Sequence, residues 1–214
     1  MKLYTVPASR YGSRCLIQIS AKGLDVATEV LAFPLPESYR AINPLMRVPA
    51  LDLGSGETLM EAHVICEYLE DLGKGPSLRP GAPRDHARMN LLIRLFEIYY
   101  DPAAVKLFPF LFGASSKDAS AIVAAGQEMR TYLEMIADRL DGGQYAVGGR
   151  LTLADCALMP PFAQARIFWP HLGLGDLIAA NRKIAAYYDA TRKDPYVAKV
   201  LDALESDIKP FLKT

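Results

Sequence analysis

The chain lacks the features that mark several large classes of protein. Basic and acidic residues both number 24 among 214 residues, so the formal net charge is zero. Binding to nucleic acid or anionic membranes rests on clustered positive charge, which is not evident here. No apolar run approaches the roughly 18 residues of a membrane span, and "MKLYTVPASR" is not the start of a signal peptide. We therefore expect a cytoplasmic protein that binds neither nucleic acid nor membrane.

Cysteine and histidine are scarce. The three cysteines (Cys15, Cys66 and Cys156) form no C-x-x-C pair and leave an odd count, which favours reduced thiols on apolar helix faces. The three histidines have neither metal-ligand spacing nor a partner carboxylate, and no phosphate-binding glycine loop is present. We expect no metal site and no hydrolase triad.

The residues that are present predict two different halves. Residues 1–78 predict the order β-α-β-α-β-β-α, with Ser9 as the N-cap of the first helix and Gly23 as its C-terminal stop. Strands are expected at residues 2–6, 25–33, 48–53 and 58–60, and the longer helices at 9–23 and 61–73. Prolines and glycines in residues 79–85 predict a linker. Residues 86–214 predict helices only.

Two short patterns carry structural information. In "RLTLADCAL", Thr152 and Asp155 predict a capping box, which is a folding device. Pro49 stands at the start of a strand, where a cis Val48–Pro49 bond costs only about 0.5–1 kcal/mol intrinsically. Such a bond would turn the Val48 main chain toward the end of the first helix, free to pair with an extended ligand. An edge strand beginning at Pro49, with no ligand, is equally consistent with this dipeptide.

Four stretches in order resemble the cytosolic glutathione transferases, in particular serine-type, bacterial-like members. They are "NPLMRVPAL", "TLMEAHVICEYLE", "RPGAPRDHARM" and "GGRLTLADCALMPPF". The resemblance covers essentially the whole chain. It implies the glutathione transferase fold, with an α/β thioredoxin-like, glutathione-binding domain at 1–78, a linker at 79–85 and an all-α domain at 86–214. It also implies a homodimer, glutathione as co-substrate without a metal, and a role in detoxification.

The resemblance implies a set of glutathione-binding residues: Arg47, Val48, Pro49, Glu61 and Ala62. Glu61 would pair with the ammonium group of glutathione, and the N–H groups of the following helix would take its γ-glutamyl carboxylate. Val48 would pair with the cysteinyl main chain, and Arg47 would meet a carboxylate. Ala62 stands where serine is usual, and Met46 where glycine is common. Without a ligand, Glu61 would only complement the helix dipole.

Ser9 is the first candidate for the group that stabilises the thiolate. A thiol with a pKa of about 8.5 is mostly protonated at neutral pH, so a transferase needs a donor aimed at the sulfur. Ser9 follows the first strand at a helix N-terminus, and its spacing to Arg14 resembles the serine-type members. An N-cap role would explain Ser9 without catalysis. Tyr4, one position off the spacing of tyrosine-type classes, and Tyr11 in the same loop are the alternatives.

The fold does not settle the function, and three hypotheses are open. The first is a transferase that conjugates the thiolate to a small apolar electrophile, with aromatic residues of the helical half as its expected contacts. The second is a non-catalytic binding or scaffolding protein, suggested by Ala62, Met46 and the loop "SRYGSR". The third is a zeta-like maleyl cis–trans isomerase. Its serine-rich loop also carries an arginine at this spacing, but Arg10 and Tyr11 replace its Ser-Cys pair.

Overall fold

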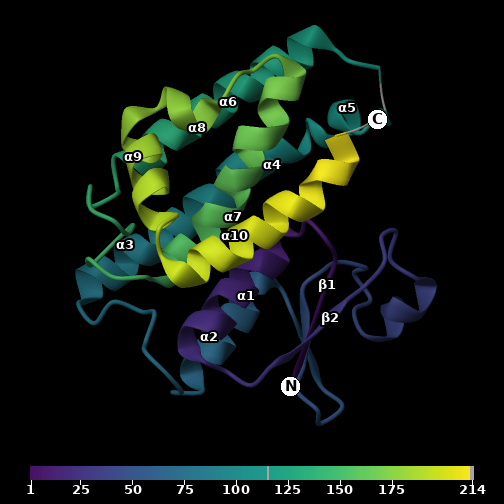
Figure 1. The fold of residues 1–214 in the computed structure, drawn as a ribbon, viewed down its shortest axis with the longest axis vertical. Coiled ribbons are helices and arrows are strands. Elements are labelled where there is room, and N and C mark those ends of the chain that lie inside the picture. Colours follow the sequence, from purple (N-terminus) through teal and green to yellow (C-terminus); the bar gives the residue numbers. More distant parts are fainter. Residues whose placement is uncertain (115, 213–214) are drawn as a thin grey trace. The chain divides into compact units, whose positions relative to one another are not determined.

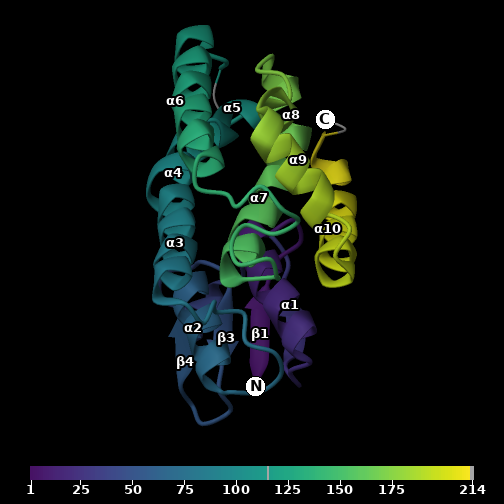
Figure 2. The ribbon, with the colours of Figure 1, turned by 90° about the vertical axis from the view of Figure 1, so that its left-hand side faces the viewer.

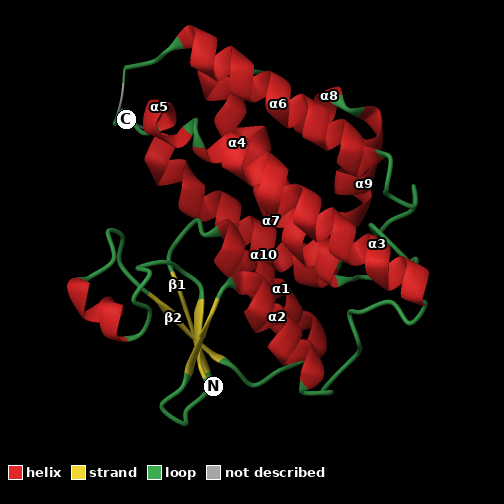
Figure 3. Cartoon of the chain, turned by 180° about the vertical axis from the view of Figure 1, so that it is seen from behind, coloured by secondary structure: helices red, strands yellow, loops and turns green. Residues whose placement is uncertain are grey.

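The computed structural model describes residues 1–114 and 116–212, which form two compact units: residues 1–78 with the described residues from Pro195 onward, and residues 79–194. Ser115 and residues 213–214, within the predicted domain 86–214, lie outside the described residues. Strands occur in the first unit, and the regular structure of the second is helical (Figures 1 and 3). The division into 1–78, 79–85 and 86–214 stays a prediction, but the contacts group the described residues from Pro195 onward with the first unit.

The sheet of the first unit has four strands in the order β2-β1-β3-β4, of which β1, β3 and β4 are labelled in Figure 2. The strands are β1 (Lys2–Thr5), β2 (Ala27–Val30), β3 (Ala50–Asp52) and β4 (Thr58–Met60). β1 pairs in parallel with β2 and antiparallel with β3, and β3 pairs antiparallel with β4. The predicted β-α-β unit and the hairpin are confirmed.

Helices α1 and α2 pack against each other in this unit, and α10 packs on α1. The helical elements are α1 (Arg10–Lys22), η1 (Glu37–Ala41), α2 (Ala62–Asp71), α10 (Pro195–Ile208) and η4 (Lys209–Leu212). Ser9 is the N-cap of α1, and Gly23 ends it in the left-handed conformation, both as predicted. Lys22 and Glu70 form an ion pair of 3.1 Å between these helices, with side chains only 1% and 3% exposed.

The second unit is built around α7 (Leu153–Phe168), which is buried along most of its length. The other elements are α3 (Pro83–Arg94), the π-helical η2 (Leu95–Tyr100), α4 (Asp101–Val105), α5 (Phe108–Leu111), α6 (Ala119–Ala137), η3 (Trp169–Leu172), α8 (Leu177–Ala180) and α9 (Arg182–Thr191). Pro102 and Pro109 are near the starts of α4 and α5, and α4 follows η2 without a break. In the described part of the chain, no helix is long and apolar enough to span a membrane.

The predicted capping box of α7 is confirmed. The N–H and hydroxyl of Thr152 donate to Asp155 Oδ2 at 2.7 and 2.8 Å. The Ala146 N–H and the Tyr187 hydroxyl donate to Asp155 Oδ1 at 2.7 and 2.9 Å. Burial raises the pKa of Asp155 to about 6 in spite of these donors. The carboxyl group joins three segments of the second unit, so its role is structural.

Candidate functional site

The register of the sheet brings three separate segments to one end of it. Tyr4 near the end of β1 pairs with Ala50 at the start of β3, and Ala50 pairs with Met60 at the end of β4. The turn that follows β1, the Val48–Pro49 bond before β3 and Glu61 after β4 therefore lie at the same end of the sheet. Both α1 and α2 begin there, and helix N-termini favour anions.

The same three segments share an uncommon backbone conformation. Among the described residues, three that are not glycine have a positive φ: Ala8 at 59°, Met46 at 51° and Glu61 at 70°. Ala8 precedes Ser9, Met46 precedes Arg47, and Glu61 is itself a predicted ligand residue. Left-handed backbone at residues other than glycine costs on the order of 1–3 kcal/mol and clusters at functional sites. This end of the sheet is the candidate site.

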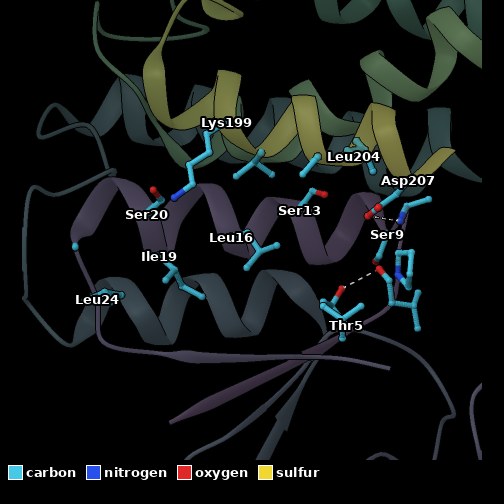
Figure 4. A pocket seen from close by; sticks show the side chains of 17 residues that line it. Thr5, Ser9, Ser13, Leu16, Ile19, Ser20, Leu24, Lys199, Leu204 and Asp207 are labelled. Carbon is cyan, nitrogen blue, oxygen red and sulfur yellow. Dashed lines mark hydrogen bonds between the residues drawn. The ribbon is translucent and has the colours of Figure 1, made fainter. Parts of the chain in front are cut away.

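Ser9 lies at the N-terminus of α1, where its Oγ accepts a hydrogen bond from the Gly12 N–H at 3.0 Å. The Ser9 N–H donates to the Val6 carbonyl at 3.3 Å, which closes the turn. The Ala8 N–H donates to Asp207 Oδ2 of α10 at 3.4 Å (Figure 4). Because the Ser9 oxygen accepts one bond, its own hydrogen stays available for an acceptor such as a thiolate.

The two tyrosines that compete with Ser9 lie in different surroundings. Tyr4 is 7% exposed and meets Tyr39 edge-on at 6.1 Å in an apolar cluster. Successive side chains of a strand point to opposite faces, so Tyr4 faces away from α1, against which the next residue, Thr5, packs. Tyr11 lies in the first turn of α1, its ring 5.3 Å from the Arg10 guanidinium. The structure brings Tyr11 close to Ser9 in the same turn and places Tyr4 on the other face.

The loop before β3 is fixed by hydrogen bonds to the Arg47 carbonyl. It accepts from the Tyr39 hydroxyl at 2.9 Å and from Asn43 Nδ2 at 2.7 Å. Burial raises the pKa of Tyr39 to about 12, partly offset by a hydrogen bond with Asn43, so Tyr39 is a neutral donor. The Arg47 side chain is exposed. The predicted cis Val48–Pro49 bond is confirmed, and the left-handed φ of Met46 explains why glycine suits that position.

Glu61 is the N-cap residue of α2, but its side chain makes no capping hydrogen bond. The side chain is instead exposed at the start of the helix. Ala62, the first residue of α2, is only 4% exposed. Neither side chain caps α2. The main-chain N–H groups in the first turn of α2 are therefore directed at this end of the sheet and receive no side-chain acceptor from Glu61.

One contact behind the site is not apparent from the sequence. Arg14, 1% exposed, lies beside His63 with its Nη2 3.0 Å from Nδ1. Arginine only donates, so His63 Nδ1 is the acceptor. The two residues are 49 positions apart and come together because α1 packs on α2. A pattern of helical periodicity shows that a face is buried, but not which residue it meets.

The predicted core position of the cysteines is confirmed, since all three are buried. Cys15 and Cys66 lie with their sulfur atoms 3.9 Å apart between α1 and α2. The hydrogen bond with Cys15 lowers the pKa of Cys66, with burial acting against it and the Arg14 charge in support. Over the described residues, no group of three or more histidine, cysteine, aspartate or glutamate side chains could hold a metal ion.

Comparisons with known proteins identify the family. Residues 3–77 match the model of the glutathione S-transferase N-terminal domain, and residues 99–195 match that of the glutathione S-transferase C-terminal domain. The chain belongs to the glutathione S-transferase family. The expected glutathione transferase fold, an α/β first part and a helical second part, is thereby confirmed.

Relatives of this glutathione S-transferase family member carry several names. The chain is 30% identical over 207 residues to a maleylpyruvate isomerase from Ralstonia sp., covering 90% of this chain and 95% of that protein. It is 28% identical over 212 residues to a maleylacetoacetate isomerase from Pseudomonas aeruginosa, covering 91% and 98%. A glutathione S-transferase from Methylobacillus flagellatus KT, solved with GSH bound, matches with TM-score 0.79 and 23% identity over 93% of this chain and 98% of that one.

Proposed function

We propose that the protein is a glutathione-dependent enzyme that transfers the glutathione thiolate to a small apolar electrophile. The observation that carries this proposal is the strand register, which places Ser9, Val48 and Glu61 at one end of the sheet. These are the segments that the family resemblance assigns to the thiolate donor, the cysteinyl main chain and the γ-glutamyl end. Membership of the family and the left-handed residues at all three segments support it.

Each residue has a distinct role in the proposed complex. The exposed Glu61 carboxylate pairs with the ammonium group, and the first N–H groups of α2 take the γ-glutamyl carboxylate. The main chain of Val48 precedes the β1–β3 pairing, which begins at Ala50, and it binds the cysteinyl main chain in strand fashion. The exposed Arg47 meets a ligand carboxylate, on a loop whose carbonyl is already fixed by Tyr39.

The proposed chemistry needs one hydrogen bond to sulfur. Ser9 donates its hydroxyl hydrogen to the thiolate, while Oγ keeps the bond from the Gly12 N–H. The thiol proton leaves to solvent, the sulfur forms a bond to the electrophilic carbon, and a leaving group such as chloride departs with the electron pair. Holding thiolate and electrophile together supplies much of the remaining acceleration.

A second candidate is a maleyl cis–trans isomerase, because two relatives of 30% and 28% identity carry isomerase names. The first step, formation of the glutathione thiolate with Ser9 as hydrogen-bond donor, would be the same as in the transferase. The thiolate adds to one carbon of the double bond, the resulting single bond rotates, and the thiolate leaves as the double bond re-forms. Arg10 and Tyr11, which follow Ser9 directly, replace the Ser-Cys pair of the zeta-like pattern. Glutathione would be regenerated in each cycle.

Two measurements separate the candidates. Retention on immobilised glutathione distinguishes either enzyme from a scaffold that does not bind the tripeptide. Free thiol is then measured during turnover of an activated aryl chloride and of a maleyl keto acid. A transferase consumes one thiol for each product molecule, and an isomerase consumes none. Failure to bind glutathione at millimolar concentration would overturn the proposed function and leave the scaffolding hypothesis.

The family resemblance also supports a homodimer, with α3 and η2 facing the partner. Leu91, Ile98 and Tyr99 are large apolar side chains of this segment that are 44%, 46% and 48% exposed. Light scattering on a sizing column gives the mass of the particle in solution, and Ile98→Asp should shift a dimer toward the monomer.

A cytoplasmic location and a role in detoxification stay predictions.

A further inference from the structure

Two thiols meet in the interior of the first unit, between α1 and α2. Cys15 of α1 and Cys66 of α2 are both 0% exposed, and their sulfur atoms lie 3.9 Å apart. Cys15 Sγ lies 4.0 Å from the Ala62 carbonyl oxygen, and Gln18 Nε2 donates to the Cys66 carbonyl at 2.8 Å. These contacts link the two helices on either side of the sulfur atoms. The packing of α1 on α2 therefore holds the two thiols at a defined separation.

This separation suits a bridging metal ion better than a covalent bond between the sulfur atoms. A disulfide would require the sulfur atoms to approach to about 2.05 Å, which is almost 2 Å closer than they lie. Metal–thiolate bonds are about 2.3 Å long, the value for zinc, and two such bonds span 3.9 Å at an angle of about 115°. A bound ion would thus need no movement of either helix.

The number and kind of ligands narrow the class of metal. Thiolates select soft cations, above all copper(I), zinc and the iron of iron–sulfur clusters. Structural zinc sites and most of these clusters take four protein ligands. Among the residues that the structure describes, no cluster of three or more histidine, cysteine, aspartate or glutamate side chains offers such a set. A site of two thiolates therefore favours copper(I).

The charge around the two thiols also favours a monovalent ion. Two thiolates and one copper(I) ion carry a net charge of −1, and a buried charge needs a compensating partner. Arg14, 1% exposed, supplies a positive charge here. The pKa of Cys66 is lowered first by the hydrogen bond with Cys15 and then by the Arg14 guanidinium, against burial and the Glu67 charge. The Arg14 charge thus favours the thiolate that a metal ion needs.

We propose that Cys15 and Cys66 form a two-coordinate binding site for copper(I). Each thiol gives up its proton to solvent as a sulfur–copper bond forms, and the ion stays copper(I), so no electron is transferred. The bound ion joins α1 to α2 and should stabilise the folded chain. The site takes no part in the proposed thiolate transfer, and its existence does not depend on that function.

The test is an anaerobic titration of the full chain with copper(I), supplied as its acetonitrile complex, in the absence of glutathione. Excess bicinchoninate competes for the ion and reports it by colour. We expect each chain to withdraw one equivalent of copper(I). Cys15→Ser and Cys66→Ser should each weaken binding at least about 100-fold, because losing even an outer partner of a metal ligand costs about 10–100-fold. Cys156→Ser, at a buried cysteine of the second unit, is the matched control and should keep one equivalent.

X-ray absorption on the copper-loaded Cys156→Ser chain examines the site with both ligands intact, so it decides the question even where Cys15→Ser or Cys66→Ser fails to fold. We expect two sulfur atoms at about 2.3 Å from copper. Three results would overturn the proposal: no copper withdrawn by the wild type, fewer than two sulfur ligands in the Cys156→Ser chain, or wild-type affinity in a folded Cys15→Ser variant.

Discussion

Thr5 of β1 leaves no room for a side chain at Gly12 of α1. A Cβ on Gly12 would overlap the Thr5 hydroxyl oxygen and lie 3.2 Å from Ser9 Oγ. Thr5 is 4% exposed and β-branched, so its side chain cannot easily turn away. The Gly12 N–H also donates to Ser9 Oγ at 3.0 Å. A side chain at position 12 would therefore crowd both Thr5 and the hydroxyl of the candidate thiolate donor.

Gly12→Ala should therefore destabilise the protein, by about 1–3 kcal/mol, the usual cost of overpacking. The better helix propensity of alanine, worth about 1 kcal/mol, offsets part of the loss. Chemical denaturation of Gly12→Ala, Thr5→Ala and the double variant measures the coupling, and Thr5→Ala should rescue much of the defect. Gly126→Ala in α6 is the matched control, because its nearest neighbour is the flexible end of Leu174. Additive effects of the two changes at residues 5 and 12 would contradict this account.

Ser9→Ala tests the proposed thiolate donor. We expect kcat/KM for an activated aryl chloride to fall by about 10-fold or more, and the apparent pKa of bound glutathione thiol to rise. The variant should stay folded, since losing an N-cap typically costs about 1 kcal/mol. Ser13→Ala, one turn later in α1, removes a hydroxyl that does not cap the helix and should keep full activity. If Ser9→Ala is fully active and Tyr11→Phe is not, the donor is Tyr11.

The departure at Ala62 gives a gain-of-affinity prediction. Ala62→Ser restores a hydroxyl at the first residue of α2, where the family pattern places the γ-glutamyl carboxylate. A well-aligned hydrogen bond to a charged group contributes about 1.5–3 kcal/mol, so glutathione should bind roughly 10-fold more tightly in calorimetric titration. Val64→Ser adds a hydroxyl to the same helix at a position that is 49% exposed, and should change nothing. Equal affinities of wild type and Ala62→Ser would show that the ligand is placed wrongly.

Much of the local structure could be predicted from the sequence, because it depends on residues close together in the chain. The caps at Ser9 and Gly23 and the capping box at Thr152 and Asp155 follow from side-chain chemistry within one helical turn. Resemblance to a known family added the fold and the candidate residues.

The relations between distant segments could not be predicted in this way. Hydrophobic periodicity shows that Tyr4 is buried in a strand, but the structure was needed to place it against Tyr39 and away from Ser9. Likewise, nothing in the chain pairs Arg14 with His63 or assigns α10 to the first unit. Burial of a charged side chain can be predicted only when its partner is known, because an unpaired charge would not be buried. The sequence alone does not identify that partner.

The buried pair of Lys22 and Glu70 illustrates this and predicts a dependence on pH. Glu70 Oε2 lies 3.1 Å from Lys22 Nζ, and Glu70 Oε1 accepts from the Leu78 N–H at 2.9 Å. Burial alone would raise the pKa of Glu70, but hydrogen bonds from Ser77, Lys22 and Leu78 and the Lys22 charge outweigh it and lower the pKa. The folded state therefore binds the proton of Glu70 less readily than the unfolded chain does.

A carboxyl group whose pKa is lowered by folding stabilises the protein above its unfolded pKa, about 4.3 for glutamate, and loses that contribution as the pH falls. The free energy of unfolding of the wild type should thus exceed that of Glu70→Gln at pH 7, and the difference should shrink between about pH 5 and pH 3. Urea unfolding of both proteins at each pH measures this difference in free energy.

Lys22→Met leaves the Glu70 carboxylate buried and without its ion-pair partner, which should cost about 3–5 kcal/mol at pH 7. The double variant Lys22→Met with Glu70→Gln should recover part of that loss, because no charge is then buried. If the difference between wild type and Glu70→Gln stays constant from pH 7 to pH 3, Glu70 has the same pKa in the folded and the unfolded protein. That result would contradict the conclusion that the ion pair with Lys22 stabilises the Glu70 carboxylate.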